Sequence, residues 1–379
     1  MTPTDRPDPR LHPPQAVLEI TRDLERAGFD VWCVGGAVRD ALLGQPHLDW
    51  DFATNATPDQ VRTVFGRKRT IPVGVAFGTV GVLDTSGVMH EVTTYRRDVR
   101  TDGRHAEVEF GASLDEDLAR RDFTINAIAY SATTGAIHDP FGGRQDLERR
   151  IVRAVGTPTD RMREDRLRAL RGIRFAARFG FEIEAATWDA IRESAPHLTR
   201  LSAERVRQEL ENTMDQVAAP SGALRLWFES GATKVLLPEL TTATPECLAA
   251  PDCAARPGPA TRPGRRLTRL AVLMSDLAED SVLEVARRLR FSKHDGRWLA
   301  TLVSAWRSLD ESMSSKLATG PFSGAEVRRW VATVGRPNLA AFFRLAAARW
   351  AVRRRAEGAV KAPPQRAVAG LYRRCLRAS

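Results

Sequence analysis

The sequence is poor in cysteine, with four residues in a chain of 379. Cys33, Cys247, Cys253 and Cys375 are scattered, and the middle two lack a second ligand pair, which argues against a zinc site and a disulfide framework. No run approaches the ~18 apolar residues of a membrane span. The polar, proline-rich segment 1–14 has no hydrophobic signal segment, so we expect a cytoplasmic protein that does not enter the membrane.

Acidic residues are fewer than basic ones, 47 against 57, and the net charge is +10. The excess is mostly arginine, which favours a polyanionic partner, although a generally basic proteome would give the same balance. Hydrophobic residues make up 43% and charged residues 27% of the chain, as in ordinary soluble globular proteins. This length allows about two to four domains or compact sub-domains.

The chain is organised around one stretch, VWCVGGAVRDALLGQPHLDWDFAT. Val31–Val34 is a short apolar run that predicts a buried strand. Gly35 and Gly36 let the backbone approach a ligand and expose its N–H groups. Ala37–Leu43 predicts a short helix whose N-terminus faces the same place, and such an end attracts phosphate. The stretch therefore predicts a phosphate-binding turn.

Two carboxylates follow this turn. Asp49 and Asp51 lie in a predicted strand over Asp49–Thr54, where a period of two residues places both on one face. Mg²⁺ takes hard oxygen ligands and usually shares them with substrate phosphates. A glycine pair alone is usually a turn, and a D-x-D pair alone is usually solvated. Together they predict a magnesium–nucleotide site.

The combination resembles a known motif. GGAVRDALLG, followed five residues later by DWD, is similar to the first motif of class II tRNA nucleotidyltransferases, a family that includes bacterial poly(A) polymerases. Further motifs continue the resemblance in order as far as Met214. The resemblance implies a polymerase-β-like α/β head with a mixed sheet and helices, followed by an all-α neck, body and tail.

The resemblance also implies roles for individual residues. Asp49 and Asp51 would hold two Mg²⁺ ions, and Glu91 in the EVTTYR segment becomes a candidate third catalytic carboxylate, although it could be a plain strand-surface residue. The implied nucleotide-binding residues lie in GGAVRD, RRDFTINA and EDRLRALRGIRF: Gly35, Gly36, Arg39, Arg121, Asp122, Asn126, Asp165, Arg168 and Arg171. In this family the counterparts of Asp165 and Arg168 form a protein template for the incoming base. Here their spacing of three places them on one face of a predicted helix.

Two predictions concern the segment between the first and second motifs. Thr79–Leu83 and Val88–Tyr95 predict the strands of a hairpin with a DTSG turn. The Gly- and charge-rich stretch Arg96–Ala112 predicts a mobile loop. This stretch resembles the flexible loop of CCA-adding members of the family, including its DGRH element, although a plain solvated loop would have the same composition.

The domain organisation follows from these segments. We expect a disordered lead-in over 1–14, a catalytic head over 15–156, a base-recognising helical neck over 157–217, a helical body over 218–310 and a basic helical tail over 311–379. In the neck, Glu204, Arg205 and Glu209 predict structural ion pairs.

Arginines of the tail predict contacts with tRNA phosphates, although a solvated arginine face would have the same pattern. The candidates are Arg353, Arg354, Arg355 and Arg373.

The family resemblance implies template-independent addition of CMP, CMP and AMP, from CTP and ATP, to the 3′ end of tRNA. A poly(A) polymerase, or a partial enzyme that adds only CC or only A, would carry the same site residues. The Arg96–Ala112 stretch favours full activity, because CC-only members of the family lack such a loop. A catalytically silent RNA-binding protein would be expected to lack a metal carboxylate or a template residue, and none is missing. Monomer and homodimer both remain open.

Overall fold

The computed structural model describes residues 8–45, 50–101, 106–254, 262–320, 322–357 and 363–378. The chain divides into two compact units. The first comprises Met1–Gly172 and Gly180–Ser194, and the second comprises Ile173–Phe179 and Ala195–Ser379. Among the described residues, every helix is too short or too polar to cross a lipid bilayer.

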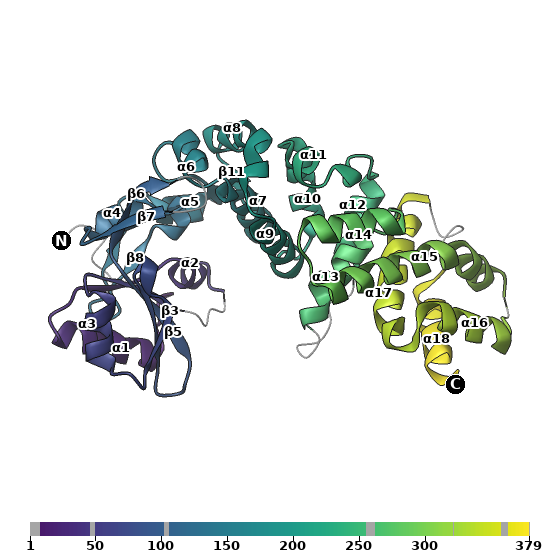
Figure 1. Cartoon of the computed structure of the whole chain (residues 1–379), viewed down its shortest axis with the longest axis horizontal. Coiled ribbons are helices and arrows are strands. Elements are labelled where there is room, and N and C mark those ends of the chain that lie inside the picture. The colour runs from purple at the N-terminus through teal and green to yellow at the C-terminus, as the bar shows by residue number, and fades with distance from the viewer. Residues whose placement is uncertain are drawn as a thin grey trace. The chain divides into compact units, whose positions relative to one another are not determined.

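The first unit is an α/β domain (Figure 1). Its strands are β1 (Val31–Val34), β2 (Asp51–Thr54), β3 (Thr70–Gly74), β4 (Thr79–Leu83), β5 (Met89–Thr94), β6 (Arg96–Thr101), β7 (Ala106–Phe110), β8 (Ala129–Tyr130), β9 (Ile137–His138), β10 (Ile151–Val152) and β11 (Glu182–Ile183). Its helices are α1 (Gln15–Arg26), α2 (Gly36–Leu42), α3 (Pro58–Phe65), η1 (Val75–Phe77), α4 (Leu114–Ala119), η2 (Thr124–Asn126), α5 (Gly143–Arg149), α6 (Pro158–Glu164), the first part of α7 (Leu167–Phe179) and α8 (Ala185–Ser194).

A seven-stranded sheet with the order β3-β4-β5-β2-β1-β8-β9 forms the centre of this unit. Strands β2 and β5 run parallel, whereas the other neighbours in this sheet are antiparallel. The mixed sheet predicted for the head is therefore confirmed. The predicted hairpin is also confirmed, because Thr79–Leu83 forms β4 and pairs with β5.

One face of the sheet is covered by helices α1 and α3. Along α1, Val17, Ile20 and Leu24 are fully buried, at the spacing that gives a helix one apolar side. Helix α3 begins at two residues that favour a helix start: Thr57 accepts a hydrogen bond from the Gln60 N–H, and Pro58 lies in the first turn. The sheet residues on this side are fully buried: Phe52, Val80, Val82 and Val92.

The prediction of a loop over Arg96–Ala112 is wrong for the described residues of that stretch. Strands β6 and β7 pair antiparallel as a separate two-stranded ribbon. The side chain of Arg97 lies 2.8 Å from Glu109 on the opposite strand and 3.4 Å from Glu116 on α4. A two-stranded ribbon needs paired backbone groups but no apolar alternation, so its composition can match that of a loop. The DGRH element, 102–105, lies outside the described residues.

The second unit is helical, as predicted for the body and the tail, and it includes residues 195–217 of the predicted neck (Figure 1). Residues 157–172 and 180–194 of that predicted neck belong to the first unit. Its elements are the last part of α7, η3 (Ala195–Arg200), α9 (Ala203–Gln216), α10 (Pro220–Glu229), α11 (Ala232–Leu236), η4 (Pro238–Leu240), α12 (Pro245–Cys253), α13 (Arg262–Leu273), α14 (Glu279–Arg288), α15 (Lys293–Thr319), α16 (Gly324–Val334), η6 (Arg336–Asn338), α17 (Leu339–Glu357) and α18 (Gln365–Arg377). The core contains Trp306 and Trp350, whose ring centroids are 5.7 Å apart.

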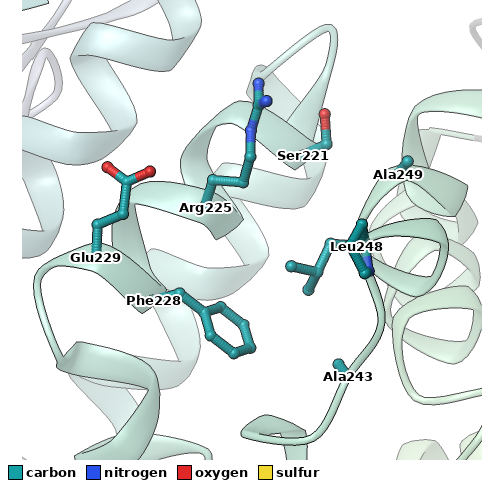
Figure 2. A pocket seen from close by; sticks show the side chains of 8 residues that line it. Ser221, Arg225, Phe228, Glu229, Ala243, Leu248 and Ala249 are labelled. Carbon is teal, nitrogen blue, oxygen red and sulfur yellow. The ribbon is translucent and has the colours of Figure 1, made fainter.

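A cavity of about 460 Å³ lies between α10 and α12 of this unit. Figure 2 shows Phe228 of α10 and Leu248 of α12 on opposite sides of it, with Arg225 and Glu229 along α10. None of the residues that the sequence predicts for the site lines this cavity.

Candidate nucleotide-binding and active site

The turn between β1 and α2 lies against two predicted site residues. Gly35 has φ 77° and ψ −133°, a backbone conformation that a residue with a Cβ rarely adopts. A Cβ at this position would lie 3.2 Å from Arg121 Nη1 and 4.0 Å from Asp51 Oδ2. The fold therefore brings the glycine turn, the arginine of RRDFTINA and the second aspartate of DWD together.

The carboxylates lie on the face of the sheet opposite α1 and α3. Strands β2 and β5 pair with Phe52 opposite Val92, so continuing the parallel register by one residue places Asp51 beside Glu91 on the same face. Asp51 is partly buried and Glu91 is exposed. The structure thus supports the pairing of these two predicted residues.

The predicted metal ligands are only partly among the described residues, since Asp49 lies outside them. Across the remaining, described chain, no group of three or more His, Cys, Asp or Glu side chains is arranged to hold a metal ion. Asp51 and Glu91 nevertheless lie at neighbouring positions of two paired strands, and carboxylate oxygens are the hard donors that Mg²⁺ prefers. The residues present therefore fit such an ion.

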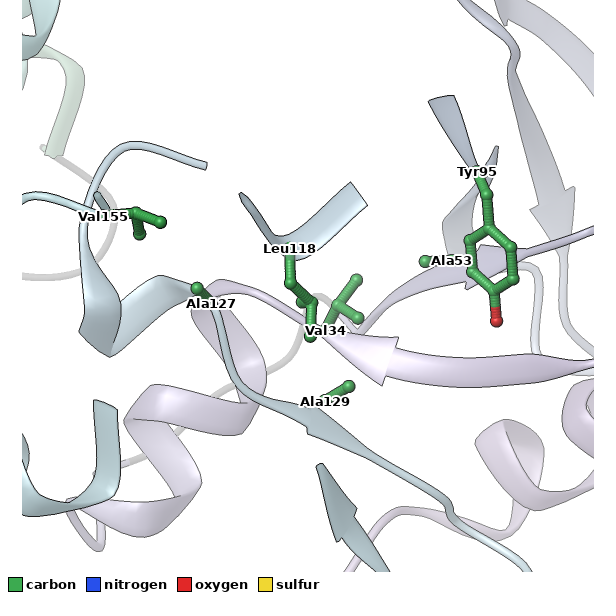
Figure 3. Close-up of a cluster of buried hydrophobic side chains, with 7 residues drawn as sticks. All are labelled: Val34, Ala53, Tyr95, Leu118, Ala127, Ala129 and Val155. Carbon is green, nitrogen blue, oxygen red and sulfur yellow. The ribbon is translucent and has the colours of Figure 1, made fainter. Parts of the chain in front are cut away.

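The sheet around Asp51 is held by a small apolar cluster on the same face. Strand β1 pairs Val34 with Asp51 on one side and with Ala129 of β8 on the other. Figure 3 shows Leu118 of α4 next to Val34, within a buried cluster that also contains Ala53, Tyr95, Ala127, Ala129 and Val155. Helix α4 thus covers this half of the face and brings its own polar residues close to the site.

Asp117 on α4 is a site residue that the sequence motifs did not single out. Its carboxylate is fully buried, accepts two hydrogen bonds from Arg120 at 2.8 and 2.9 Å, and accepts one from Arg121 Nη2 at 3.1 Å. Burial alone would raise the pKa of Asp117, but the charges of Arg121 and Arg120 outweigh it and lower the pKa. Asp117 therefore stays ionised and positions Arg121. The i, i+3 and i, i+4 spacing in LDEDLARRD was the available signal.

A largely buried polar network connects three of the predicted motifs. Arg39 of α2 donates to Asp40 at 2.8 Å and to Asn126 Oδ1 at 2.5 Å. Asn126 Nδ2 in turn donates to Asp122 Oδ1 at 2.8 Å, and Arg171 Nε of α7 donates to Asp122 Oδ2, also at 2.8 Å. Four predicted nucleotide-binding residues are thus brought together. Arg39, however, is buried at 4% exposure and contacts protein groups in this structure.

The network stabilises the ionised form of Asp122. Burial would raise the pKa of this carboxyl, but the charge of Arg171 and hydrogen bonds from Asn126 and Arg171 outweigh it and lower the pKa from 3.8 to about 2. A carboxylate with a depressed pKa stabilises the fold above pH 3.8, and this contribution is lost as the pH falls toward about 2.

Asp122→Asn is therefore expected to lower the free energy of unfolding by about 2 kcal/mol at pH 7, since each unit of pKa shift is worth about 1.4 kcal/mol. The difference from the unsubstituted protein should shrink as the pH falls from about 4 to about 2. Urea unfolding at a series of pH values measures it, with Asp59→Asn on the exposed side of α3 as control. A difference that does not change with pH would contradict the charge argument.

The prediction that Asp165 and Arg168 lie on one helix face is wrong. Helix α6 ends at Glu164, and Asp165 has an extended backbone with φ −144° and ψ 104°. Its Oδ1 accepts the N–H of Leu167 at 3.0 Å and so caps α7. Aspartate is a favoured residue at the start of a helix. Its capping hydrogen bond therefore starts a new helix at a place where the spacing of apolar residues predicts a single continuous one.

Arg168 is buried and held by the head. It donates to Glu164 Oε2 at 2.7 Å, to the Arg161 carbonyl at 3.1 Å and to the Arg120 carbonyl at 2.9 Å. Glu164, to which the sequence motifs assign no role, therefore positions this predicted template arginine. Asp165 lies just before the first turn of α7, and Arg168 lies within that turn. The two residues therefore remain close to each other.

The predicted ion pairs of the second unit are confirmed for two residues. Glu209 Oε1 lies 2.5 Å from Arg174 Nε, and both side chains are almost fully buried. Glu204 lies 2.7 Å from Arg290 at the surface. Arg205 donates its backbone N–H to the Ser202 side chain, which caps the start of α9.

The candidate RNA-binding arginines of the tail differ in their surroundings. Arg353 lies 2.6 Å from Asp310, which also accepts a hydrogen bond from Trp350 at 2.8 Å. Arg354 donates to the Pro363 carbonyl. Arg355 and Arg373 are exposed.

Two family models match this chain. "Poly A polymerase head domain" matches residues 31–153, and "Probable RNA and SrmB-binding site of polymerase A" matches residues 180–244. The CCA-adding enzyme of Geobacillus thermodenitrificans strain NG80-2 is 44% identical over 229 residues, which are 60% of this chain and 55% of that protein. The matching stretch therefore spans about half the length of this curated relative.

Solved structures show the same fold. The crystal structure of the Bacillus stearothermophilus CCA-adding enzyme in complex with CTP is 33% identical, with a TM-score of 0.73 over 97% of this chain and 82% of that one. The Thermotoga maritima CCA-adding enzyme complexed with tRNA is 23% identical, with a TM-score of 0.69 over 97% of this chain and 83% of that one, and supports the fold alone. The motifs, the assembled site and these matches together place the chain in the family of class II tRNA nucleotidyltransferases and bacterial poly(A) polymerases.

Proposed function

We propose that this chain adds CMP, CMP and AMP to the 3′ end of tRNA in the cytoplasm, using CTP and ATP as substrates. The proposal depends mainly on one observation: Arg121 and Asp51 both lie next to Gly35 in the head. These residues come from two motifs far apart in the sequence. The match to a CCA-adding enzyme seen with CTP, 33% identical and aligned over 97% of this chain, supports the choice of substrate.

The phosphates of the incoming nucleotide would lie between the glycine turn and Arg121. Gly35 brings the backbone close, and the Arg121 guanidinium offers a fixed fork of donors to phosphate oxygens. Asp117 keeps that fork in place through its bond to Nη2 at 3.1 Å. Asp122, held ionised by Arg171, would accept a hydrogen bond from a ribose hydroxyl, and Asn126 would hold Asp122 in position.

Mg²⁺ ions, two in number, would be held by Asp49 and Asp51, with Glu91 as the third carboxylate. When bound, they would activate the 3′-hydroxyl of the RNA and neutralise charge on the triphosphate. The carboxylates of this chain contribute fixed negative charge on an open sheet face next to the glycine turn, where both substrates must meet.

Base selection is assigned to Asp165 and Arg168. In support, Glu164 and two backbone carbonyls fix the Arg168 guanidinium, and a template needs donors that do not move. The ribbon formed by β6 and β7 supports the full CCA activity over CC addition alone, since it occupies the segment that CC-only members lack.

The exposed tail arginines are proposed to contact tRNA phosphates. Replacing Arg355 and Arg373 together with Ala should weaken tRNA binding and leave CTP binding unchanged, because phosphate contacts act by releasing counterions. Each lost contact should reduce the slope of log K against log salt by about 0.7–0.9. Filter binding at several salt concentrations measures this slope. Arg287→Ala, an exposed arginine on α14, is the matched control, and an unchanged slope in the double variant would remove the tail from the interface.

One experiment tests the proposed function. Purified protein is incubated with tRNA lacking its 3′ end, ending in C or ending in CC, with each nucleoside triphosphate singly and in pairs, and the products are sequenced. Addition that stops at CCA supports the proposal. Runs of A would indicate a poly(A) polymerase, products that end at CC or that require a CC end would indicate a partial enzyme, and no extension would indicate a non-catalytic RNA-binding protein.

A further inference from the structure

The described part of the first unit exposes an unusual group of large apolar side chains. They lie on β3, on η1, at the end of β7, at the start of β5 and at the residue before β5, and each is between 38% and 51% exposed: Ile71, Val73, Val75, Phe77, Val88, Met89 and Phe110. We refer to Ile71, Val73, Phe77, Met89 and Phe110 as the apolar platform. A contiguous exposed group of this kind usually marks a binding surface.

The platform shares the sheet face that carries the carboxylates. Ile71 pairs with Gly81 across β3 and β4, and Gly81 pairs with Glu91 across β4 and β5. Residues that pair across strands point to the same side, so Ile71 and Val73 face the same way as Glu91 and Asp51. On the opposite side Val80, Val82 and Val92 are completely buried. The exposure is therefore specific to the face with the candidate active site.

Glycines keep the platform flat. A Cβ at Gly81 would lie 2.7 Å from Met89 Sδ and 2.9 Å from Val73 Cγ2, so these two side chains close over the strand. A Cβ at Gly78 would lie 2.5 Å from the Phe110 ring, which rests on the backbone next to Phe77. The result is a shallow apolar surface with two aromatic rings at one end.

The platform lies at a short distance from the carboxylates and beside positive charge. Three strand spacings separate β3 from β2, or about 14 Å, within reach of the last nucleotides of an RNA whose 3′ end is at Asp51. Arg67 and Lys68, both exposed, lie in the turn before β3 and are separated from that strand by one residue. A flat apolar surface for bases flanked by cations for phosphates is the arrangement by which proteins bind single-stranded nucleic acid.

We propose that the apolar platform stacks the unpaired 3′-terminal nucleosides of the RNA substrate and guides its end to the carboxylates. The proposal rests on the proposed function, since it identifies the attacking hydroxyl with an RNA 3′ end. Stacking suits this task because every base has a π face. The surface can therefore hold an end whose terminal base changes with each addition, which base-specific hydrogen bonds could not do.

A binding experiment without nucleoside triphosphate tests the platform independently of catalysis. The full chain is titrated with a tRNA acceptor-stem RNA whose unpaired 3′ terminus is 2-aminopurine, a base whose fluorescence falls when it stacks. Phe77→Ser, Phe110→Ser and Val73→Ser alter exposed side chains, and Leu283→Ser on α14, 37% exposed, is the matched control. Each aromatic variant is expected to bind this RNA roughly tenfold or more weakly and to lose quenching, with an unchanged Kd for CTP and an unchanged Tm.

Several results would overturn the proposal. The first is full quenching and unchanged affinity in all three platform variants. The second is a protein that sediments as a dimer and becomes monomeric only in those variants, which would make the platform a contact between copies along the β3 edge. If quenching depends on the platform but the unsubstituted protein extends no tRNA, stacking stands and the proposed catalytic function falls. If the unsubstituted protein extends tRNA but quenching does not depend on the platform, the proposed catalytic function stands and the stacking proposal falls.

Discussion

Asp51→Asn is expected to abolish nucleotidyl transfer while leaving tRNA binding close to normal. Asp51 Oδ2 lies 4.0 Å from where a Cβ on Gly35 would be. Asp51 is also the first residue of β2, which runs parallel to β5, the strand that carries Glu91. The amide keeps the volume of the side chain but removes the negative charge that a divalent cation and its bound phosphates require. Metal stabilisation of a phosphoryl transition state is worth several kcal/mol, so turnover should fall about a thousandfold or more.

The measurement is single-turnover CMP addition to tRNA ending without CCA, together with tRNA affinity by filter binding. Asp59→Asn is the control, because that carboxylate is 92% exposed on α3 and pairs with Arg62 only at 3.9 Å. A Tm equal to that of the unsubstituted protein would show that the variant is folded. Near-normal turnover of Asp51→Asn in Mg²⁺ would place the catalytic carboxylates elsewhere.

Asp165→Asn is expected to remove most of the preference for CTP and ATP over UTP and GTP. Cytosine and adenine both present an amino donor beside an unprotonated ring nitrogen, whereas uracil and guanine present a carbonyl beside a ring N–H. A carboxylate only accepts and a guanidinium only donates. Asp165 and Arg168 therefore match the first pair of bases and leave like groups opposed for the second pair.

In this structure, a change of Asp165 to asparagine tests base selection more specifically than a change to alanine. Asp165 Oδ1 caps α7 through Leu167 N–H at 3.0 Å, and asparagine caps about as well. Asp165→Asn should therefore keep the helix start while adding a donor where the template needs an acceptor. Unpaired buried polar groups cost roughly 1–3 kcal/mol each, so the ratio of kcat/KM for CTP over UTP should fall by about ten- to a hundredfold.

Initial rates with all four nucleoside triphosphates decide this prediction. Asp160→Asn on α6 is the control, because its side chain is 59% exposed and lies 3.8 Å from Arg163 at the surface. Asp165→Ala should also lose the preference and, in addition, destabilise the start of α7. Discrimination as sharp as in the unsubstituted protein would show that other residues select the base.

The sequence by itself determined the elements that depend on local signals. Thr57 and Pro58 mark the start of α3, Ser202 marks the start of α9, and the alternation of Thr79–Leu83 specifies a strand. These signals are contained within a few neighbouring residues, since a cap or a period of two depends on adjacent backbone groups. The family resemblance likewise needs only the sequence, because it depends on the identity and order of residues within short motifs such as GGAVRDALLG and RRDFTINA.

Local signals were not sufficient where solvent or neighbouring segments decide the outcome. Strands β6 and β7 are paired through their backbones, and no apolar periodicity marks them in the sequence. The spacing of apolar residues predicts one helix through Asp165, but the structure has two. The Asp165 side chain accepts the N–H of Leu167, which in a continuous helix would donate to a backbone carbonyl.

Only the tertiary structure decided which polar residues meet. Arg39, Asn126, Asp122 and Arg171 form one chain of hydrogen bonds, although they come from three segments of the sequence and the outermost two, Arg39 and Arg171, are 132 positions apart. Asp117 joins them through Arg121, and the apolar platform exists because β3 and β4 leave one sheet face uncovered. Sequence spacing determines which side chains share a helix or strand, whereas contact between distant side chains depends on how the sheet and its helices pack.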